Sequence, residues 1–149
     1  NLAARPADSR ALLADLYWAA VAAAAPGPAL RAALGKSELT LIRPIHLIAL
    51  GKAALPMAEA AVAVLHERGI APASGLLVVP EPAQSPHPRL VVAVGDHPQP
   101  GPGSLAAADR LAQVVQAVQP GDEVWILLSG GTTSLVGAPL PGLRQVDLT

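Results

Sequence analysis

A lysine follows the first strongly apolar strand that the sequence predicts, in the pair Gly51-Lys52. The run Ile45–Leu50 has the pattern of a strand that is buried on both faces. A glycine at a strand-to-helix junction lets a ligand approach the backbone, and the free N–H groups of the first helical turn attract an anion. Lys52 would add a full positive charge at that point. The alternative is an ordinary turn with a solvated lysine, and both interpretations stay open here.

A second candidate follows the apolar strand Val124–Leu128, in the run Ser129-Gly130-Gly131-Thr132-Thr133-Ser134. Backbone N–H groups and hydroxyls in such a turn can bind phosphate oxygens. The run is not a Walker A loop, because neither the spacing nor a Gly-Lys-Ser/Thr ending is present. A plain glycine turn after a strand is the alternative.

The third candidate is the turn Gly95-Asp96-His97-Pro98. Adjacent Asp and His side chains can supply a general base or a metal ligand, although the neighbouring prolines also fit a plain rigid turn. The segment Gly101–Ala106 matches the pattern G-x-G-x-x-A ahead of a helix. Several loop residues separate it from the strand that ends at Val94, so we do not interpret it as a dinucleotide fingerprint.

The remaining histidines do not indicate a metal site. His46 lies within an apolar strand and is expected to pack in the core, His66 is expected to be solvated on a helix, and His87 lies between two prolines. No two histidines have a metal-ligand spacing and the chain has no cysteine. The sequence therefore predicts no metal site built by the protein.

The spacing of apolar residues predicts the elements that carry these loops. Helices are predicted at residues 9–25, 29–34, 53–68 and 104–119, and strands at 45–50, 75–79, 90–94 and 123–128. Leu12, Leu16, Ala19 and Ala23 form a stripe on the first helix, which Pro26-Gly27-Pro28 ends, and Ser104 is the expected N-cap of the last helix. Buried strands that alternate with helices predict an α/β fold with a parallel sheet.

The composition excludes several classes of protein. The chain has 149 residues, a net charge of −1 and 52% hydrophobic residues, with a mean hydropathy of +0.43, which excludes a disordered chain. The small charge removes the electrostatic argument for a nucleic-acid or anionic-membrane partner. The longest apolar stretch is shorter than the ~20 residues of a membrane span, and no secretory signal is recognised, so we expect no membrane association and a cytoplasmic location. Because the first residue is Asn1, we expect a piece of a longer protein or a trimmed one.

Three blocks, taken in their order along the chain, resemble a known family. They are Leu50-Gly51-Lys52-Ala53-Ala54 with Met57-Ala58, then Gly95-Asp96-His97-Pro98 with Pro100, then Leu127-Leu128-Ser129-Gly130-Gly131. Together they are similar to the N-terminal part of the glycerate 2-kinases whose second domain is called MOFRL, some of which carry the older label hydroxypyruvate reductase. The resemblance covers about residues 8–149. It implies that residues 1–149 form a Rossmann-like N-terminal α/β domain, that the second domain is absent, and that phosphate passes from ATP, with Mg²⁺, to D-glycerate.

The resemblance also implies roles for the residues that match the family's blocks. Lys52 would neutralise charge on the transferred phosphoryl group. The implied contacts to phosphate, nucleotide or substrate are Gly51, His97, Ser104, Ser129, Gly130, Gly131, Thr132 and Thr133. Thr132 stands where the family has a third glycine, and threonine does not readily adopt the positive φ of glycine. Thr133 stands where serine is usual in the family. Gly101 stands where an acidic residue commonly follows the family's His-Pro-x-Pro turn.

The resemblance therefore implies an ATP- and Mg²⁺-dependent D-glycerate 2-kinase, represented by a portion that is expected to be inactive alone. One alternative is an NAD(P)H-dependent hydroxypyruvate reductase, for which the Gly101–Ala106 match is the sequence support. Another is a truncated, non-catalytic member that binds an anion. The apolar helix faces allow a homodimer without requiring one.

Overall fold

The structure is a computed structural model of the chain, and it describes residues 9–36, 43–139 and 142–143. The elements in chain order are α1 (Ser9–Ala23), α2 (Pro26–Lys36), β1 (Ile45–Leu50), α3 (Ala54–Glu67), β2 (Ser74–Val79), β3 (Leu90–Val94), α4 (Pro102–Ala117), β4 (Glu123–Leu128) and α5 (Thr132–Leu135). The predicted strands are confirmed to within one residue.

The four strands form one sheet in the order β3-β2-β1-β4, and each neighbouring pair is parallel. The predicted parallel α/β fold is therefore confirmed. Leu50, the last residue of β1, pairs with Val78 on one side and with Leu128 on the other. The carboxyl ends of these strands consequently meet at the same edge of the sheet.

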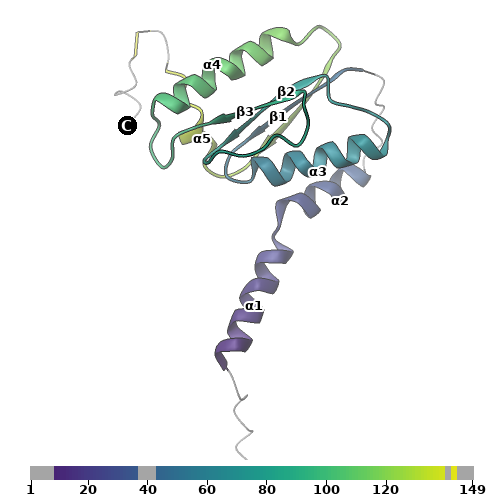
Figure 1. Ribbon diagram of the computed structural model, residues 1–149, viewed down its shortest axis with the longest axis vertical. Coiled ribbons are helices and arrows are strands. Elements are labelled where there is room, and N and C mark those ends of the chain that lie inside the picture. Colours follow the sequence, from purple (N-terminus) through teal and green to yellow (C-terminus); the bar gives the residue numbers. More distant parts are fainter. Residues whose placement is uncertain (1–8, 37–42, 140–141, 144–149) are drawn as a thin grey trace, which may run out of the picture.

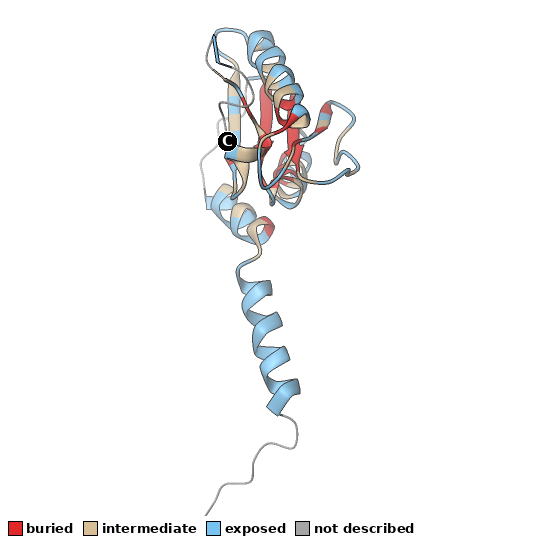
Figure 2. Cartoon of the chain, turned by 90° about the vertical axis from the view of Figure 1, so that its left-hand side faces the viewer, coloured by how far each residue is buried: buried red, intermediate tan, exposed pale blue. Residues whose placement is uncertain are grey.

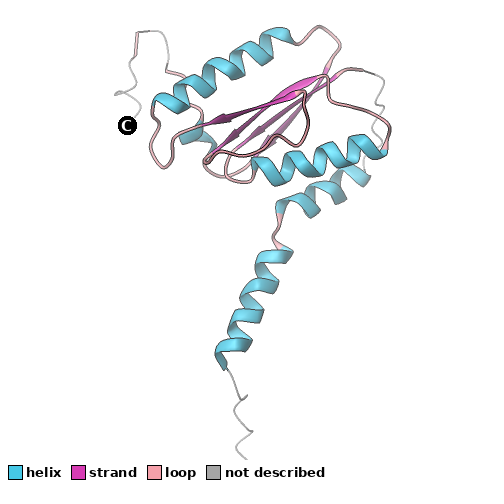
Figure 3. Cartoon of the chain, in the orientation of Figure 1, coloured by secondary structure: helices cyan, strands magenta, loops and turns pink. Residues whose placement is uncertain are grey.

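Helices cover both faces of the sheet, with α2 and α3 on one side and α4 and α5 on the other (Figures 1 and 3). Alternate residues of the central strands supply the two cores. Leu47 and Leu77 pack on the α3 side, and Ile48 and Leu76 pack on the α4 side. This is why β1 reads as a continuous apolar run, since a strand covered on both faces needs apolar side chains in both directions.

The edge strands differ from the prediction that every strand is a buried run. On β4, alternate side chains are exposed, namely Val124, Ile126 and Leu128. The physical reason is the position of α4, which packs against β2 and β3 and leaves the same face of β4 uncovered.

The first two helices also depart from expectation. Pro26-Gly27-Pro28, predicted to end the first helix and to precede the second, forms the first turn of α2, where proline fits because the first helical N–H groups have no helical acceptor. Gly27 is buried against α3, and a Cβ there would lie 3.1 Å from the Pro56 carbonyl oxygen. The stripe predicted on α1 is left uncovered, because no residue of α1 is buried (Figure 2).

Within the described part of the chain, no helix is long and apolar enough to span a membrane.

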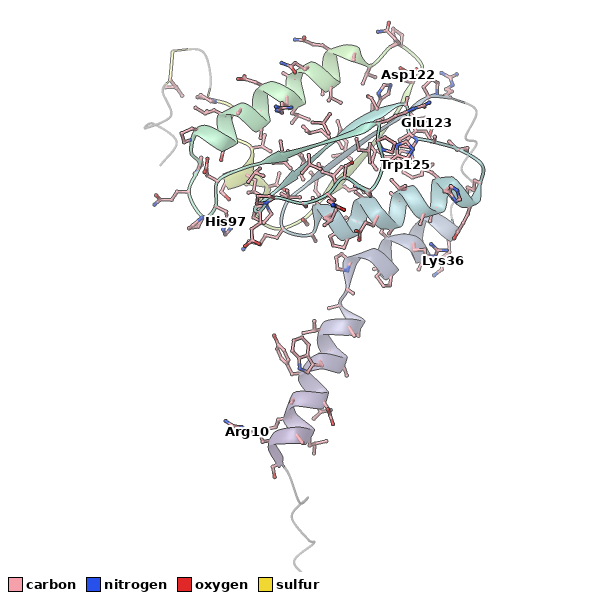
Figure 4. The ribbon with its side chains drawn as sticks, viewed as in Figure 1. Arg10, Lys36, His97, Asp122, Glu123 and Trp125 are labelled. Atoms are coloured by element: carbon pink, nitrogen blue, oxygen red, sulfur yellow. The ribbon has the colours of Figure 1, made fainter. Side chains whose placement is uncertain are left out.

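His46 is a core histidine, as predicted, and it joins β1 to β2 and to the residue before β4 at the amino end of the sheet. Its Nε2 lies 3.0 Å from Asp122 Oδ2 and its Nδ1 lies 2.8 Å from Ser74 Oγ. Figure 4 shows Asp122 at the end of the sheet opposite to His97. Hydrogen bonds from the Gln119 backbone N–H and from His46 hold the pKa of Asp122 below its usual value.

The lowered pKa of Asp122 predicts a loss of stability in acid. The ionised carboxylate stabilises the fold at pH values above its unfolded-state pKa of about 4, and this contribution disappears as the pH falls through the lower folded-state pKa. Asp122→Asn is therefore expected to flatten the fall of melting temperature between about pH 5 and pH 2.5, as followed by circular dichroism. Asp109→Asn, an exposed carboxyl on α4, is the matched control. An unchanged acid profile in Asp122→Asn would assign the loss to other groups.

Candidate functional site

The candidate site lies where the carboxyl ends of β1 and β4 meet. Within the sheet, β2 and β3 lie along one edge of β1, and β4 pairs with its other edge. In open parallel sheets such a reversal of strand order opens a crevice beyond the carboxyl ends, where ligands bind. The segments that follow these two strands carry Lys52 and Ser129–Thr133, the last two residues of which begin α5, so the structure brings two of the predicted motifs together.

Hydrogen bonds lock the two loops into one unit. The Leu50 carbonyl oxygen accepts from the Ser129 N–H at 2.9 Å and from the Ser129 hydroxyl at 3.2 Å. In return, the Ala53 N–H donates to Ser129 Oγ at 3.0 Å and the Lys52 N–H donates to the Gly130 carbonyl at 2.9 Å. The backbone beneath Lys52 is thereby held by the loop that follows β4.

Gly51 has no room for a side chain. A Cβ at this residue would lie 2.3 Å from Ser129 Oγ and 2.6 Å from the Ser129 carbonyl oxygen, and its φ is +116°. Both the close approach of the two loops and the left-handed backbone require glycine. Gly51 therefore permits the contact between the loops and presents no group of its own to a ligand.

Lys52 and His97 come together over Gly131. A Cβ on Gly131 would lie 3.3 Å from Lys52 Cγ and 3.4 Å from His97 Cδ2, so side chains from two separate loops border this one glycine. Both side chains are exposed. The N–H groups of Gly130 and Gly131 donate no hydrogen bond within the described part of the chain. An ammonium group beside unbonded backbone N–H groups can bind an anion.

The His97 loop is anchored by the residue before it. Asp96 Oδ2 accepts from the Gly103 N–H at 2.7 Å and from the Ser104 N–H at 3.2 Å, which are donors in the first turn of α4. Gly101 admits this carboxylate, because a Cβ there would lie 2.5 Å from Asp96 Oδ2. The peptide bond between His97 and Pro98 is cis. Asp96, considered at first as a base or metal ligand, thus positions the loop.

Ser104 differs from its prediction as the N-cap of α4. The N-cap is Gly101 and Ser104 is the third residue of the helix, because Pro102 starts it and the Asp96 carboxylate binds its first donors. Ser104 is fully buried. Its hydroxyl donates to the Ser134 carbonyl at 2.6 Å and accepts from the Asp96 N–H at 3.0 Å. Ser104 therefore supports the two loops and offers no surface to a ligand.

The hydroxyl residues after β4 differ in orientation: two of them bond to backbone carbonyls inside the junction, and Thr133 faces solvent. The Ser129 and Thr132 hydroxyls point inward, and Thr132 Oγ1 lies 3.1 Å from the Leu50 carbonyl and 2.8 Å from the Ser129 carbonyl. Thr133 is exposed. The conflict expected at Thr132 does not arise, because Gly131 adopts the positive φ (+92°) and Thr132 begins α5.

A small apolar pocket that was not predicted from the sequence lies beside Lys52. Its volume is about 250 Å³, and it is lined by Lys52, Leu55, Pro56 and residues 79–83. The available signal was the proline-rich segment directly after β2, since the carboxyl end of β2 lies at the same edge of the sheet as that of β1.

Comparison with known proteins supports a single family. The family model described as "Domain of unknown function (DUF4147)" matches residues 12–149. The human protein named "Glycerate kinase" is 32% identical over 166 aligned residues, which cover 93% of this chain and 31% of that protein. The "D-glycerate 2-kinase" of Thermotoga maritima is 32% identical and covers 96% of this chain and 33% of its own length. A "Putative hydroxypyruvate reductase" of Agrobacterium vitis is 33% identical over 68% of this chain.

The solved structures agree with the sequence relatives. The crystal structure of glycerate kinase from Thermotoga maritima superimposes with a TM-score of 0.79 at 28% identity, covering 95% of this chain and 33% of that one. The chain thus spans about a third of the length of the curated relatives named here as glycerate kinases.

The tight contact at Gly51 predicts a strong effect of a single methyl group. Gly51→Ala is expected to lower the free energy of unfolding by more than about 2 kcal/mol, because the new Cβ meets Ser129 and the positive φ is strained. Urea denaturation measures this loss. Gly35→Ala is the matched control, since a Cβ there meets nothing within 4 Å, and it should be neutral or stabilising by up to about 1 kcal/mol. Equal stability of Gly51→Ala and the native chain would contradict the described junction.

Proposed function

Because this chain belongs to the DUF4147 family, we propose that it supplies the phosphate-binding part of an ATP-dependent D-glycerate 2-kinase, which transfers the γ-phosphate to D-glycerate and yields 2-phosphoglycerate. Relatives named glycerate kinase at about 30% identity support this proposal. The observation that carries it is the meeting of Lys52 with His97 and the Gly130-Gly131 backbone at one edge of the sheet.

The proposed reaction suits the groups found there. The oxygen of the C2 hydroxyl of glycerate attacks the γ-phosphorus, the bond from that phosphorus to the bridging oxygen breaks, ADP departs, and the hydroxyl loses its proton. Phosphoryl transfer depends mainly on positioning and on stabilising negative charge. The Lys52 ammonium would stabilise charge on the transferred group, and the Gly130 and Gly131 N–H groups with the Thr133 hydroxyl would hold phosphate or carboxylate oxygens.

Apart from His97, the other residues that match the family's blocks would position Lys52, Gly130, Gly131 and Thr133 and would not contact the ligand themselves. Ser129, Thr132 and Gly51 hold the two loops together, and Ser104 with Asp96 holds the loop that carries His97 beside Lys52. Mg²⁺ would accompany ATP, because it usually binds substrate phosphates with several waters. In the described residues, no group of three or more acidic or histidine side chains is placed to hold a metal ion, and we assign none to Mg²⁺.

The reductase alternative has support from the names of two relatives, which are called putative hydroxypyruvate reductases. The Gly101–Ala106 segment offers it little, because the Gly103 and Ser104 N–H groups at the start of α4 already donate to Asp96. A dinucleotide pyrophosphate would need such donors. We therefore favour the kinase, with the non-catalytic anion-binding protein as the remaining alternative.

The kinase proposal predicts that Lys52→Met lowers turnover at least about 100-fold, as expected for loss of a charge that stabilises the transition state. The melting temperature should not change, because the Lys52 side chain is exposed. Lys36→Met is the matched control, since Lys36 is the other lysine of the chain and lies at the end of α2. The assay supplies ATP, Mg²⁺ and D-glycerate to the protein as its gene encodes it and measures phosphoglycerate.

Two further outcomes would decide against the proposal. Oxidation of NADH with hydroxypyruvate, without phosphoglycerate formation from ATP, would identify the reductase. If neither product forms, the kinase proposal is wrong, and calorimetry of ATP and phosphate binding to the native chain and to Lys52→Met then tests the anion-binding alternative.

A further inference from the structure

The loop between β3 and α4 carries His97 across the carboxyl edge of the sheet. β3 is the outermost strand on one side and β4 is the outermost strand on the other, so three strand spacings, or about 14 Å, separate their ends. His97 nevertheless borders Gly131, in the segment after β4, and its Cδ2 lies 3.4 Å from the position of a Cβ on that glycine. The loop thus brings an imidazole to a place where its own strand does not lead.

Contacts on both sides of His97 hold this loop against α5. Before it in the chain, Gly95 packs so closely on α5 that a Cβ there would meet the Leu135 carbonyl oxygen. After it, the buried Ser104 donates its hydroxyl hydrogen to the Ser134 carbonyl. The position of His97 is therefore fixed by the backbone of its loop and requires no hydrogen bond from its own ring.

The His97 ring is available to accept a proton. Within the described part of the chain its nitrogens bond to no protein group, and the side chain is exposed. Both ring nitrogens of His46 are bonded, and Nδ1 of His87 accepts from the Arg89 N–H. His66 lies in the last turn of α3, at the amino end of the sheet. His97 is thus the histidine that the fold places at the candidate site.

The charged side chains near His97 are less suited to this role. Among the described residues, the loops at this edge hold two acidic side chains, Asp96 and Glu81. The Asp96 carboxylate accepts from two N–H groups in the first turn of α4. Glu81 lines the pocket on the β2 side of Lys52, which neither His97 nor Gly131 borders. The Lys52 ammonium donates hydrogen bonds only, and α5 and the first turn of α4 carry no acidic side chain.

We propose that His97 is the catalytic base of the phosphoryl transfer, an inference that rests on the proposed kinase function. The C2 hydroxyl of glycerate gives its proton to Nε2 of His97 while its oxygen bonds to the γ-phosphorus. The bond from that phosphorus to the bridging oxygen breaks, and ADP leaves. Nε2 is the nitrogen bonded to the Cδ2 that borders Gly131. In protein kinases too, a side chain beside the phosphate-binding groups accepts the proton of the attacking hydroxyl.

His97→Gln should lower turnover at least about 100-fold, as expected for loss of a general base. The assay supplies ATP, Mg²⁺ and D-glycerate to the protein as its gene encodes it. The native rate should fall in mildly acid solution, where an imidazole is protonated, and the residual activity of His97→Gln should lack this fall. Melting temperature should not change, because the side chain is exposed. His66→Gln, an exposed histidine on α3, is the matched control and should keep the native rate and pH profile.

Two more variants separate a base from a positive charge. His97→Lys should be as inactive as His97→Gln, and free imidazole should restore part of the activity of His97→Ala. A His97→Lys variant with nearly native turnover would assign His97 to charge attraction and overturn the proposal. So would a native rate and pH profile in His97→Gln, although phosphoglycerate formation that depends on Lys52 would still support the kinase. If the native protein forms no phosphoglycerate, both proposals are wrong.

Discussion

The hydrogen bonds between the Leu50 carbonyl and the loop after β4 are the interaction on which the site depends. Leu50 ends the central strand, and Ser129 and Thr132 bind its carbonyl oxygen from a loop that lies 79 residues further along the chain at Ser129. This junction closes only because Gly51 has no side chain. The position of Lys52, one residue further on, follows from that fit, since its own N–H is bonded to Gly130.

The polar groups around this junction form an inner and an outer set. The Ser129, Thr132 and Ser104 hydroxyls bond to backbone atoms and hold the loops. The outer set consists of an exposed ammonium, an exposed imidazole, an exposed hydroxyl and backbone N–H groups. Positive charge and fixed donors dominate this outer set, which is the combination that an oxygen-rich anion requires. The inner set supplies rigidity, so that the donors need little reorganisation when charge develops nearby.

Much of the fold could be predicted from the sequence because its main determinants are local. Buried strands, helical periodicity and glycine at the ends of elements identify the parallel sheet and place Lys52 at the carboxyl end of β1. The errors concern residues whose role is decided by distant contacts. Ser104 resembles a helix cap, but Asp96 supplies that function through the fold, and the exposed rows on β4 depend on where α4 comes to lie. The inward orientation of the Ser129 and Thr132 hydroxyls likewise depends on a carbonyl that is distant in sequence.

The strand order also determines when the site can form. β1, β2 and β3 pair with their nearest neighbours along the chain, whereas β4 is made last and must insert beside β1. Closing the long loop between β1 and β4 has a larger entropic cost than the nearer pairings have, and non-local strand pairing is slower for the same reason. A nascent chain can therefore build three quarters of its sheet while the loop of Lys52 still lacks its support. The candidate site is therefore complete only once β4 has joined the sheet beside β1.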